Sequence, residues 1–137
     1  MGGVPRSHKH ERRRKMKDIK RNLTMLCDYY ELTMGNGYFA NGMKDKIVYF
    51  DVFYRDNPDN GGYAIVAGLE QIVEYIKDLH FDEGDIEYLR GRGCFSEEFL
   101  EYLRTFKFSG DIWAIPEGTV VFPGEPLMIV RAPIVEA

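Results

Sequence analysis

The sequence predicts an α+β fold, in which helices and strands occupy separate stretches of one domain. The 137 residues are 45% hydrophobic and 29% charged, which is typical of a soluble globular protein. A helical pattern is followed by a strand pattern, then by further helical patterns, and only short β runs follow residue 110. Because strands and helices do not alternate regularly, the order favours α+β over α/β. The composition excludes collagen-like, disulfide-scaffold and fully disordered proteins.

The first ordered segments are a helix over residues 24–41 and a strand over Ile47–Tyr54. Apolar side chains recur at helical spacing through the first segment, and Asn41-Gly42 ends the pattern. The second segment is β-branched and aromatic, and Asp51 interrupts one of its faces. Residues 56–62 are rich in Asn, Asp and Gly, which predicts a loop.

Three more helices are expected after a short strand at Tyr63–Ala67. Asp82 is the predicted N-cap of a helix over 83–90, and Ser96 is the predicted N-cap of the helix that follows. Side chains of these types accept hydrogen bonds from backbone amides of the first helical turn. The helix over 69–79 has an apolar face made of Leu69, Ile72, Val73, Ile76 and Leu79. The helix after Ser96 has a predicted buried stripe made of Phe99, Leu100, Leu103 and Phe106.

Three short strands end the chain, at Asp111–Ile115, Thr119–Phe122 and Leu127–Arg131. Turns rich in Pro and Gly separate them. The sequence then stops within an apolar stretch, at Ala137, and this abrupt ending predicts a truncated protein.

Residues 1–21 form a basic tail, with nine Lys and Arg against two acidic residues. The first fifteen residues hold one large aliphatic side chain, Val4, so we expect disorder. Residues 11–15 (ERRRK) stand directly before Met16, and purine-only codons can encode all of them. We therefore expect this run to be the translation of a purine-rich ribosome-binding site that lies upstream of the coding sequence. The true start of the protein is then Met16. The tail lacks interleaved aromatic residues, and we expect no nucleic-acid partner.

The chain shows no signature of a membrane or secreted protein. No apolar run approaches the roughly 20 residues of a membrane span, and no apolar core of a signal peptide follows the basic tail. Cys27 and Cys94 lack CxxC spacing, which favours free thiols in a cytoplasmic protein, although two cysteines leave a disulfide open.

Two places carry polar groups suited to ligand binding. Asp28–Met34 is a dense polar and aromatic cluster, in which Tyr30 and Thr33 are helical neighbours. From the pattern alone, an ordinary amphipathic helix with tyrosines at the edge of the core is the favoured explanation. Arg55 follows a strand and precedes a glycine-containing loop, where a guanidinium can grip a phosphate or carboxylate. The alternative for Arg55 is a surface ion pair with Asp56 or Asp59. Phosphate-loop and metal-protease motifs are absent, and the isolated His80 indicates no metal site.

Five segments together resemble the nicotinate phosphoribosyltransferase family. They are Asp28-x-Tyr30-x-Leu32-Thr33-Met34, residues 50–58 (FDVFYRDNP), 61–64 (GGYA), 67–70 (AGLE) and 110–123 (GDIWAIPEGTVVFP). The resemblance covers residues 22–137 without a large gap and leaves the basic tail outside.

The resemblance implies the N-terminal α+β domain of a type II phosphoribosyltransferase, with helices and a small β-sandwich-like unit. The α/β barrel domain of the family is absent from this chain. Family members join nicotinate to 5-phosphoribosyl 1-pyrophosphate, giving nicotinate mononucleotide and pyrophosphate, with coupled ATP hydrolysis, in NAD salvage. ATP and Mg²⁺ are expected for the full-length enzyme. We expect this fragment to bind neither and to be inactive alone.

The resemblance also implies roles for individual residues. Tyr30 matches a tyrosine that stacks on nicotinate across a homodimer interface, and an electron-poor ring favours such stacking. Arg55 matches an arginine near the phosphates, while Asp28 and Thr33 are expected to position the helix. No catalytic residue is assigned, because the phosphorylated histidine of the family lies downstream and His80 does not match it.

Two alternatives stay open. One is a non-catalytic dimerisation or binding module derived from this domain, and the other is a sister enzyme that uses nicotinamide or quinolinate. A reading frame that resumes after Ala137 in the DNA favours truncation of an enzyme. We expect the fragment to expose apolar patches and to associate.

Overall fold

The computed structural model describes residues 22–137, which hold four α-helices, one 3-10 helix and five strands. Helices and strands occupy separate stretches, so the predicted α+β class is confirmed. The basic tail, with its predicted disorder and its alternative start at Met16, lies outside the described residues. Within residues 22–137, no helix combines the length and apolar character that crossing a bilayer requires.

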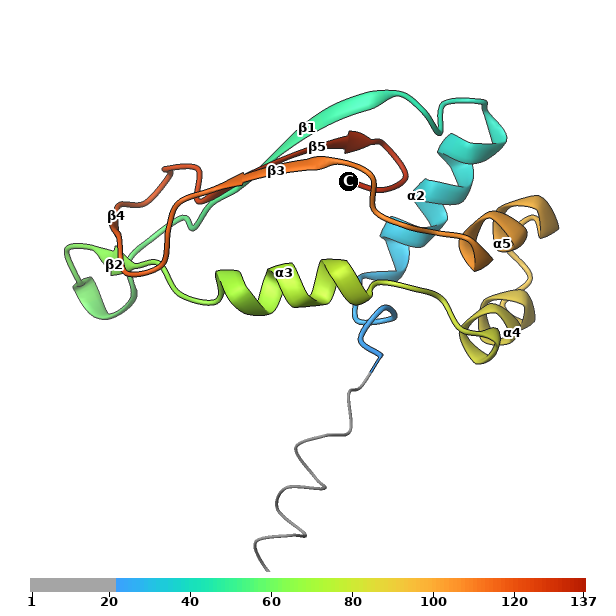
Figure 1. The fold of residues 1–137 in the computed structure, drawn as a ribbon, viewed down its shortest axis with the longest axis horizontal. Coiled ribbons are helices and arrows are strands. Elements are labelled where there is room, and N and C mark those ends of the chain that lie inside the picture. Colours follow the sequence, from blue (N-terminus) through green and yellow to red (C-terminus); the bar gives the residue numbers. More distant parts are fainter. Residues whose placement is uncertain (1–21) are drawn as a thin grey trace, which may run out of the picture.

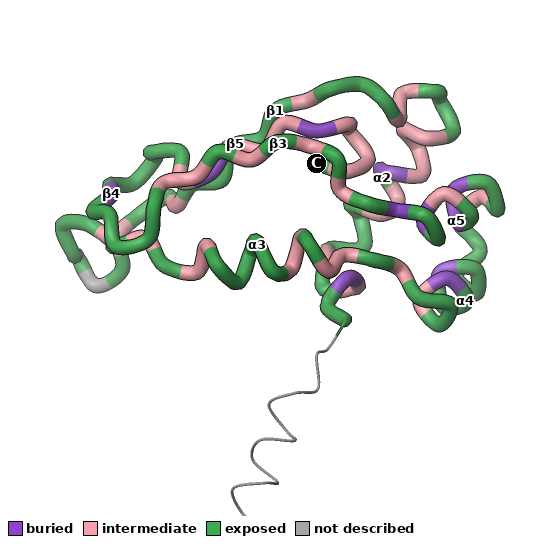
Figure 2. Tube along the Cα trace, viewed as in Figure 1, coloured by how far each residue is buried: buried purple, intermediate pink, exposed green. Residues whose placement is uncertain are grey.

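Three helices form one end of the molecule and hold most of its core (Figures 1 and 2). They are α2 (Tyr29–Ala40), α4 (Glu83–Gly91) and α5 (Glu97–Arg104). Gly35 of α2 faces the ring of Phe99, and a Cβ at Gly35 would lie 3.4 Å from that ring, so α2 packs against α5 at this residue. The buried core cluster consists of Ile86, Leu89, Phe99, Leu100, Leu103 and Phe106, which confirms the stripe predicted for the last helix.

Side-chain caps fix where α4 and α5 begin. The Asp82 carboxylate accepts a bond from the Asp85 amide at 2.9 Å, and the Asp85 carboxylate accepts one from the Asp82 amide at 3.0 Å. The Ser96 hydroxyl oxygen accepts a bond from the Phe99 amide at 3.2 Å. Both predicted N-caps are therefore confirmed, and such a cap typically contributes about 1 kcal/mol.

The strands form two antiparallel sheets. In the larger sheet, β5 (Met128–Pro133) lies between β1 (Ile47–Val52) and β3 (Asp111–Ala114). The smaller sheet pairs β2 (Ala64–Ile65) with β4 (Val120–Val121). A 3-10 helix, η1 (Pro58–Asn60), lies in the loop before β2. Figure 1 shows the smaller sheet at the end of the molecule opposite to α4 and α5.

Helix α3 (Leu69–Asp78) runs beneath the larger sheet and spans the distance between the two ends (Figure 1). It begins after Gly68, whose φ of 101° is in the left-handed region that favours glycine. The Glu117 carboxylate accepts bonds from the amides of Gly68 and Glu70, at 2.9 and 3.3 Å. Unlike α5, α3 contains no buried residue, although its apolar face is complete.

Several predicted boundaries were wrong, one because of a local turn and two because of contacts with distant residues. The first helix starts at Tyr29 rather than residue 24, since residues 23–26 form a turn. The strand predicted to reach Tyr54 ends at Val52. Tyr54 donates its hydroxyl proton to the carbonyl of Val121, 2.9 Å away. The last strand continues to Pro133, because the whole of β1 pairs with it.

Candidate functional site

Tyr30 lies in the first turn of α2, and its side chain is 59% exposed. Asp28 occupies the N-cap position with extended backbone, but its carboxylate forms no capping bond. The Thr33 hydroxyl donates to the main-chain carbonyl of Tyr30 at 3.0 Å. This bond stabilises the helical turn that carries Tyr30 and does not involve the phenol ring. The phenol ring of Tyr30 is therefore presented to solvent by a formed helix.

The face of α2 next to Tyr30 is fastened to the loop between α4 and α5. The Tyr29 hydroxyl and the Cys94 thiol are 2.9 Å apart, and the Tyr29 ring meets Phe95 edge-on at 5.9 Å. Two turns further along the same face of α2, the Asn36 side-chain amide donates to the Cys94 carbonyl at 3.4 Å and accepts from the Ser96 amide at 3.1 Å. These contacts fix how α2 is rotated, and hence the direction in which Tyr30 points.

A cation completes this attachment. The guanidinium of Arg92 lies 5.7 Å from the ring centre of Tyr29 and 5.9 Å from that of Tyr88. The hydrogen bond with Cys94 raises the pKa of the Tyr29 hydroxyl, and the hydrogen bond with Tyr29 raises the pKa of Arg92. The sequence analysis did not predict this cluster. The one feature of the sequence that could have indicated it is the seven-residue spacing of Tyr29 and Asn36, which places both on one helical face.

Arg55 lies in the exposed segment that follows β1. It forms no hydrogen bond or ion pair with the side chains that the structure describes. The preceding residue anchors the loop, because the Tyr54 hydroxyl bonds both to the Val121 carbonyl at 2.9 Å and to Asn57 at 3.1 Å. The guanidinium thus projects from a fixed loop entrance.

The structure does not bring Tyr30 and Arg55 together. Figure 1 shows the N-terminal turn of α2 beside the last turn of α3, whereas the segment after β1 lies towards the small sheet at the other end. Neither side chain lines the two hollows described below. Within one chain, the two predicted binding residues therefore belong to different places.

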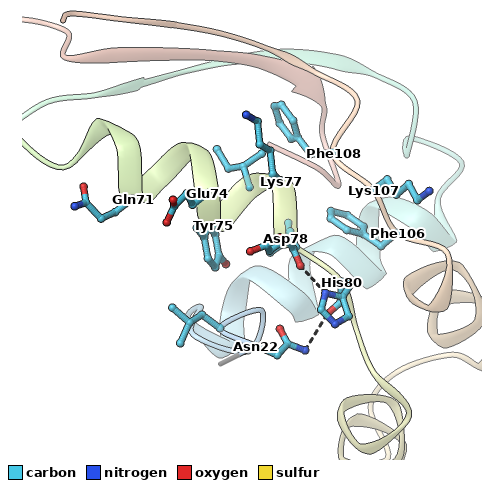
Figure 3. A pocket seen from close by; sticks show the side chains of 13 residues that line it. Asn22, Gln71, Glu74, Tyr75, Lys77, Asp78, His80, Phe106, Lys107 and Phe108 are labelled. Carbon is cyan, nitrogen blue, oxygen red and sulfur yellow. Dashed lines mark hydrogen bonds between the residues drawn. The ribbon is translucent and has the colours of Figure 1, made fainter. Parts of the chain in front are cut away.

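A hollow of about 1030 Å³ lies at the C-terminal end of α3 (Figure 3). His80 is on its border, and its main chain is used structurally. The His80 amide donates to the Thr24 hydroxyl at 3.0 Å, and its carbonyl accepts from the Asn22 side chain at 3.1 Å. The imidazole Nδ1 faces the Asp78 carbonyl. These contacts connect α3 to the segment that precedes α2.

A second hollow of about 420 Å³ lies beside the start of α2, lined by Met25, Cys27, Tyr29, Leu32, Asp85 and Tyr88. Burial, together with the charges of Glu31 and Asp28, raises the pKa of the Cys27 thiol. Cys27 and Cys94 are both free thiols. Among residues 22–137, no group of three or more His, Cys, Asp or Glu side chains could hold a metal ion.

Comparison with known proteins identifies the domain. The profile of the nicotinate phosphoribosyltransferase (NAPRTase) N-terminal domain matches residues 25–137. The chain belongs to this family. A nicotinate phosphoribosyltransferase of Mycobacterium tuberculosis is 47% identical over 113 residues, which are 82% of this chain and 24% of that relative. One of Bacillus subtilis is 39% identical over 116 residues, which are 85% of this chain and 24% of the relative.

A solved structure extends the likeness to three dimensions. The crystal structure of human nicotinic acid phosphoribosyltransferase matches with a TM-score of 0.73 and 30% sequence identity. The match covers 80% of this chain and 23% of the human chain. The chain thus spans about a quarter of the family members that it matches, and it corresponds to their N-terminal domain.

Proposed function

We propose that this chain supplies the N-terminal domain of a nicotinate phosphoribosyltransferase. Such an enzyme joins nicotinate to 5-phosphoribosyl 1-pyrophosphate and releases pyrophosphate, a step of NAD salvage in the cytoplasm. The observation that supports this most strongly is the 47% identity, over 113 residues, with a relative of that name. The chain alone is proposed to be inactive, because the match covers 24% of that relative.

Tyr30 is proposed to stack on the pyridine ring of nicotinate. Tyr30 is 59% exposed, and its hydroxyl forms no hydrogen bond with the described residues, so the side chain is accessible to a ligand. The helix under it is held by Tyr29 and Asn36, which reduces the entropy lost when the ring is ordered by a substrate. An offset stack of this kind contributes about 0.5–1.5 kcal/mol beyond the area it buries.

Arg55 is proposed to bind a phosphate group, because a guanidinium presents two parallel N–H donors to two phosphate oxygens. Tyr30 lies in the first turn of α2, and Figure 1 shows the start of α2 well away from the segment after β1 that carries Arg55. Neither of the two hollows described above brings the two side chains of one chain together. We therefore propose that at least one of them completes the active site of another subunit in a homodimer.

Magnesium and ATP belong to the proposal for the full-length enzyme. Residues 22–137 gather no set of ligands for a metal ion. The proposal therefore assigns no residue of this stretch to magnesium or to ATP.

A joined protein tests the proposal. In it, residues 22–137 are followed by the part of the Mycobacterium tuberculosis relative that comes after its matched region. We expect Tyr30→Ala to raise the KM for nicotinate about tenfold or more, and Tyr30→Phe to change it less than about threefold. Tyr49→Ala is the matched control, since Tyr49 is also an exposed tyrosine (65%) but lies on the sheet. Equal effects of the two alanine variants would refute the role of Tyr30.

The same assay tests the remaining parts. Arg55→Ala is expected to raise the KM for 5-phosphoribosyl 1-pyrophosphate by about one to two orders of magnitude, as for a lost charge-assisted bond. Faster turnover of nicotinamide or quinolinate than of nicotinate would point to a sister enzyme instead. Nicotinate mononucleotide formation by the 137-residue chain alone would contradict its proposed inactivity.

A further inference from the structure

Three asparagines of the chain stand directly before a glycine. The pairs are Asn36-Gly37, Asn41-Gly42 and Asn60-Gly61. In such a pair the backbone nitrogen of the glycine can attack the side-chain carbonyl of the asparagine, because glycine has no side chain that hinders the approach. The three pairs are alike in sequence, so the fold decides which of them is free to react.

The Asn36-Gly37 pair is held inside α2. The side-chain nitrogen of Asn36 donates to the Cys94 carbonyl at 3.4 Å, and its oxygen accepts from the Ser96 amide at 3.1 Å. Closing a ring between side chain and backbone also requires the pair to leave the helical conformation. Part of α2 must therefore unfold before this pair reacts.

The Asn41-Gly42 pair is held at the C-terminal end of α2, although both residues are exposed. The side-chain nitrogen of Asn41 donates to the Gly37 carbonyl at 2.8 Å. The Gly42 amide, which is the attacking group, donates to the Phe39 carbonyl at 3.0 Å. Both reacting groups are thus bonded to the last turn of the helix.

The Asn60-Gly61 pair is held least. It ends η1, a single 3-10 turn in the exposed loop before β2, at the end of the molecule that carries the smaller sheet (Figure 1). The Asn60 side chain forms no hydrogen bond with the described residues. The Gly61 amide donates to the Pro58 carbonyl at 3.0 Å, across that one turn.

The backbone at Asn60 favours opening of this turn. Its φ of 56° is in the left-handed region, which is less favourable for asparagine than for glycine. A short exposed turn also opens at a smaller cost in free energy than the end of a packed helix. Asn60 therefore combines a free side chain with a backbone nitrogen that is easily released.

We propose that Asn60 is a site of spontaneous deamidation in the folded protein. The Gly61 nitrogen forms a bond to Cγ of Asn60, the bond from Cγ to the side-chain nitrogen breaks, and ammonia leaves with the proton that Gly61 gives up. Water then opens the five-membered ring at one of its two carbonyls and gives aspartate or isoaspartate. The amide is exchanged for a carboxylate, and water is the one co-reactant.

The product adds one negative charge to a chain whose formal net charge is −4. The new carboxylate lies five residues after Arg55, in the segment between β1 and β2. Under the proposed function, on which this consequence rests, the carboxylate opposes the binding of a phosphate group by the Arg55 guanidinium. The effect is small, because both groups are exposed and salt screens them.

Peptide mass spectrometry tests the proposal on the 137-residue chain, aged in native buffer and in urea. In the folded chain we expect Asn60 to convert about tenfold or more faster than Asn36 and Asn41. In urea the three rates should lie within about threefold of one another, because the fold no longer distinguishes the pairs. Asn57 is the internal control and should stay intact in both, since Pro58 has no amide proton.

Two outcomes of this measurement would overturn the proposal. One is conversion of Asn36 or Asn41 as fast as Asn60 in the folded chain. The other is conversion of Asn60 in urea alone.

Two matched variants give a second readout, in the chain alone and in the joined protein. Asn60→Gln and Asn41→Gln each lengthen one exposed side chain by a methylene group, so the ring that must close has six members and forms more slowly. On isoelectric focusing after ageing, we expect the more acidic form to disappear with Asn60→Gln and to remain with Asn41→Gln. Its persistence with Asn60→Gln, or its loss with Asn41→Gln, would refute the proposal.

Asn60→Asp in the joined protein measures the consequence for catalysis. We expect the KM for 5-phosphoribosyl 1-pyrophosphate to rise about two- to threefold relative to Asn60→Gln, with the KM for nicotinate unchanged. Equal values in the two variants, with Arg55→Ala still raising this KM, would contradict the effect of the new charge. An unchanged KM in Arg55→Ala as well would instead contradict the proposed role of Arg55.

Discussion

Two substitutions of glycine by alanine are expected to change stability in opposite directions. At Gly110, a methyl group would overlap the Arg131 carbonyl and lie 2.5 Å from the Ala132 Cβ. Both obstacles belong to the backbone of β5 or are attached directly to it, so β3 must move away from β5 at its first residue. Overpacking of this kind costs about 1–3 kcal/mol. Since the backbone at Gly110 is not left-handed, the loss is steric.

Gly37 is the matched control. It lies inside α2, and a methyl group there would meet nothing within 4 Å outside its own helix. Alanine lowers the conformational entropy of the unfolded chain and favours the helix, which should stabilise the fold by about 0.5–1 kcal/mol.

Urea and thermal unfolding of the 137-residue chain measure both effects. With roughly 4 °C for each kcal/mol in a domain of this size, Gly110→Ala should lower the melting temperature by about 4–12 °C, whereas Gly37→Ala should raise it by a few degrees. If Gly110→Ala unfolds at the same denaturant concentration as the unsubstituted chain, the close approach of β3 and β5 at this residue is not real.

Three further outcomes are expected from the same unfolding measurements. Ser96→Ala removes the N-cap of α5 and should cost about 1 kcal/mol, while Ser96→Asp should retain most of the stability. Phe99→Ala leaves a cavity in the core and should cost about 3–5 kcal/mol; a loss below 1 kcal/mol would mean that α2 collapses onto α5. Burial raises the pKa of Tyr102 to about 12 from its ordinary value of 10.0, so the folded state holds this proton more tightly than the unfolded state does. Its contribution to stability is complete below pH 10 and is lost between about pH 10 and 12, and Tyr102→Phe should reduce that alkaline slope.

Much of the helical end could be predicted from the sequence. Phe99, Leu100 and Leu103 repeat at helical spacing, and Ser96 stands where a cap is needed, so local pattern and tertiary packing agree there. The family was also evident, because Asp28–Met34 and residues 110–123 are long and distinctive strings. Confirmation came from the match over residues 25–137.

The boundaries and the attachments of α2 could not be predicted in this way. The end of β1 depends on Tyr54 reaching Val121, and the orientation of Tyr30 depends on Asn36 bonding to residue 94, 58 positions away. Side-chain partners this far apart leave no periodic signal in the sequence.

The sequence by itself determined the class of the fold, the helix caps, the core stripe of α5 and the resemblance that names Tyr30 and Arg55. These features depend on neighbours within one or two turns, where residue type and spacing decide the outcome. Only the tertiary structure decided that Tyr30 and Arg55 lie apart, and that apolar residues of α3 and of β1 stay exposed. An apolar stripe shows that a helix face must be buried, but the element that buries it is fixed by the path of the whole chain. For α3, residues 22–137 do not supply that element.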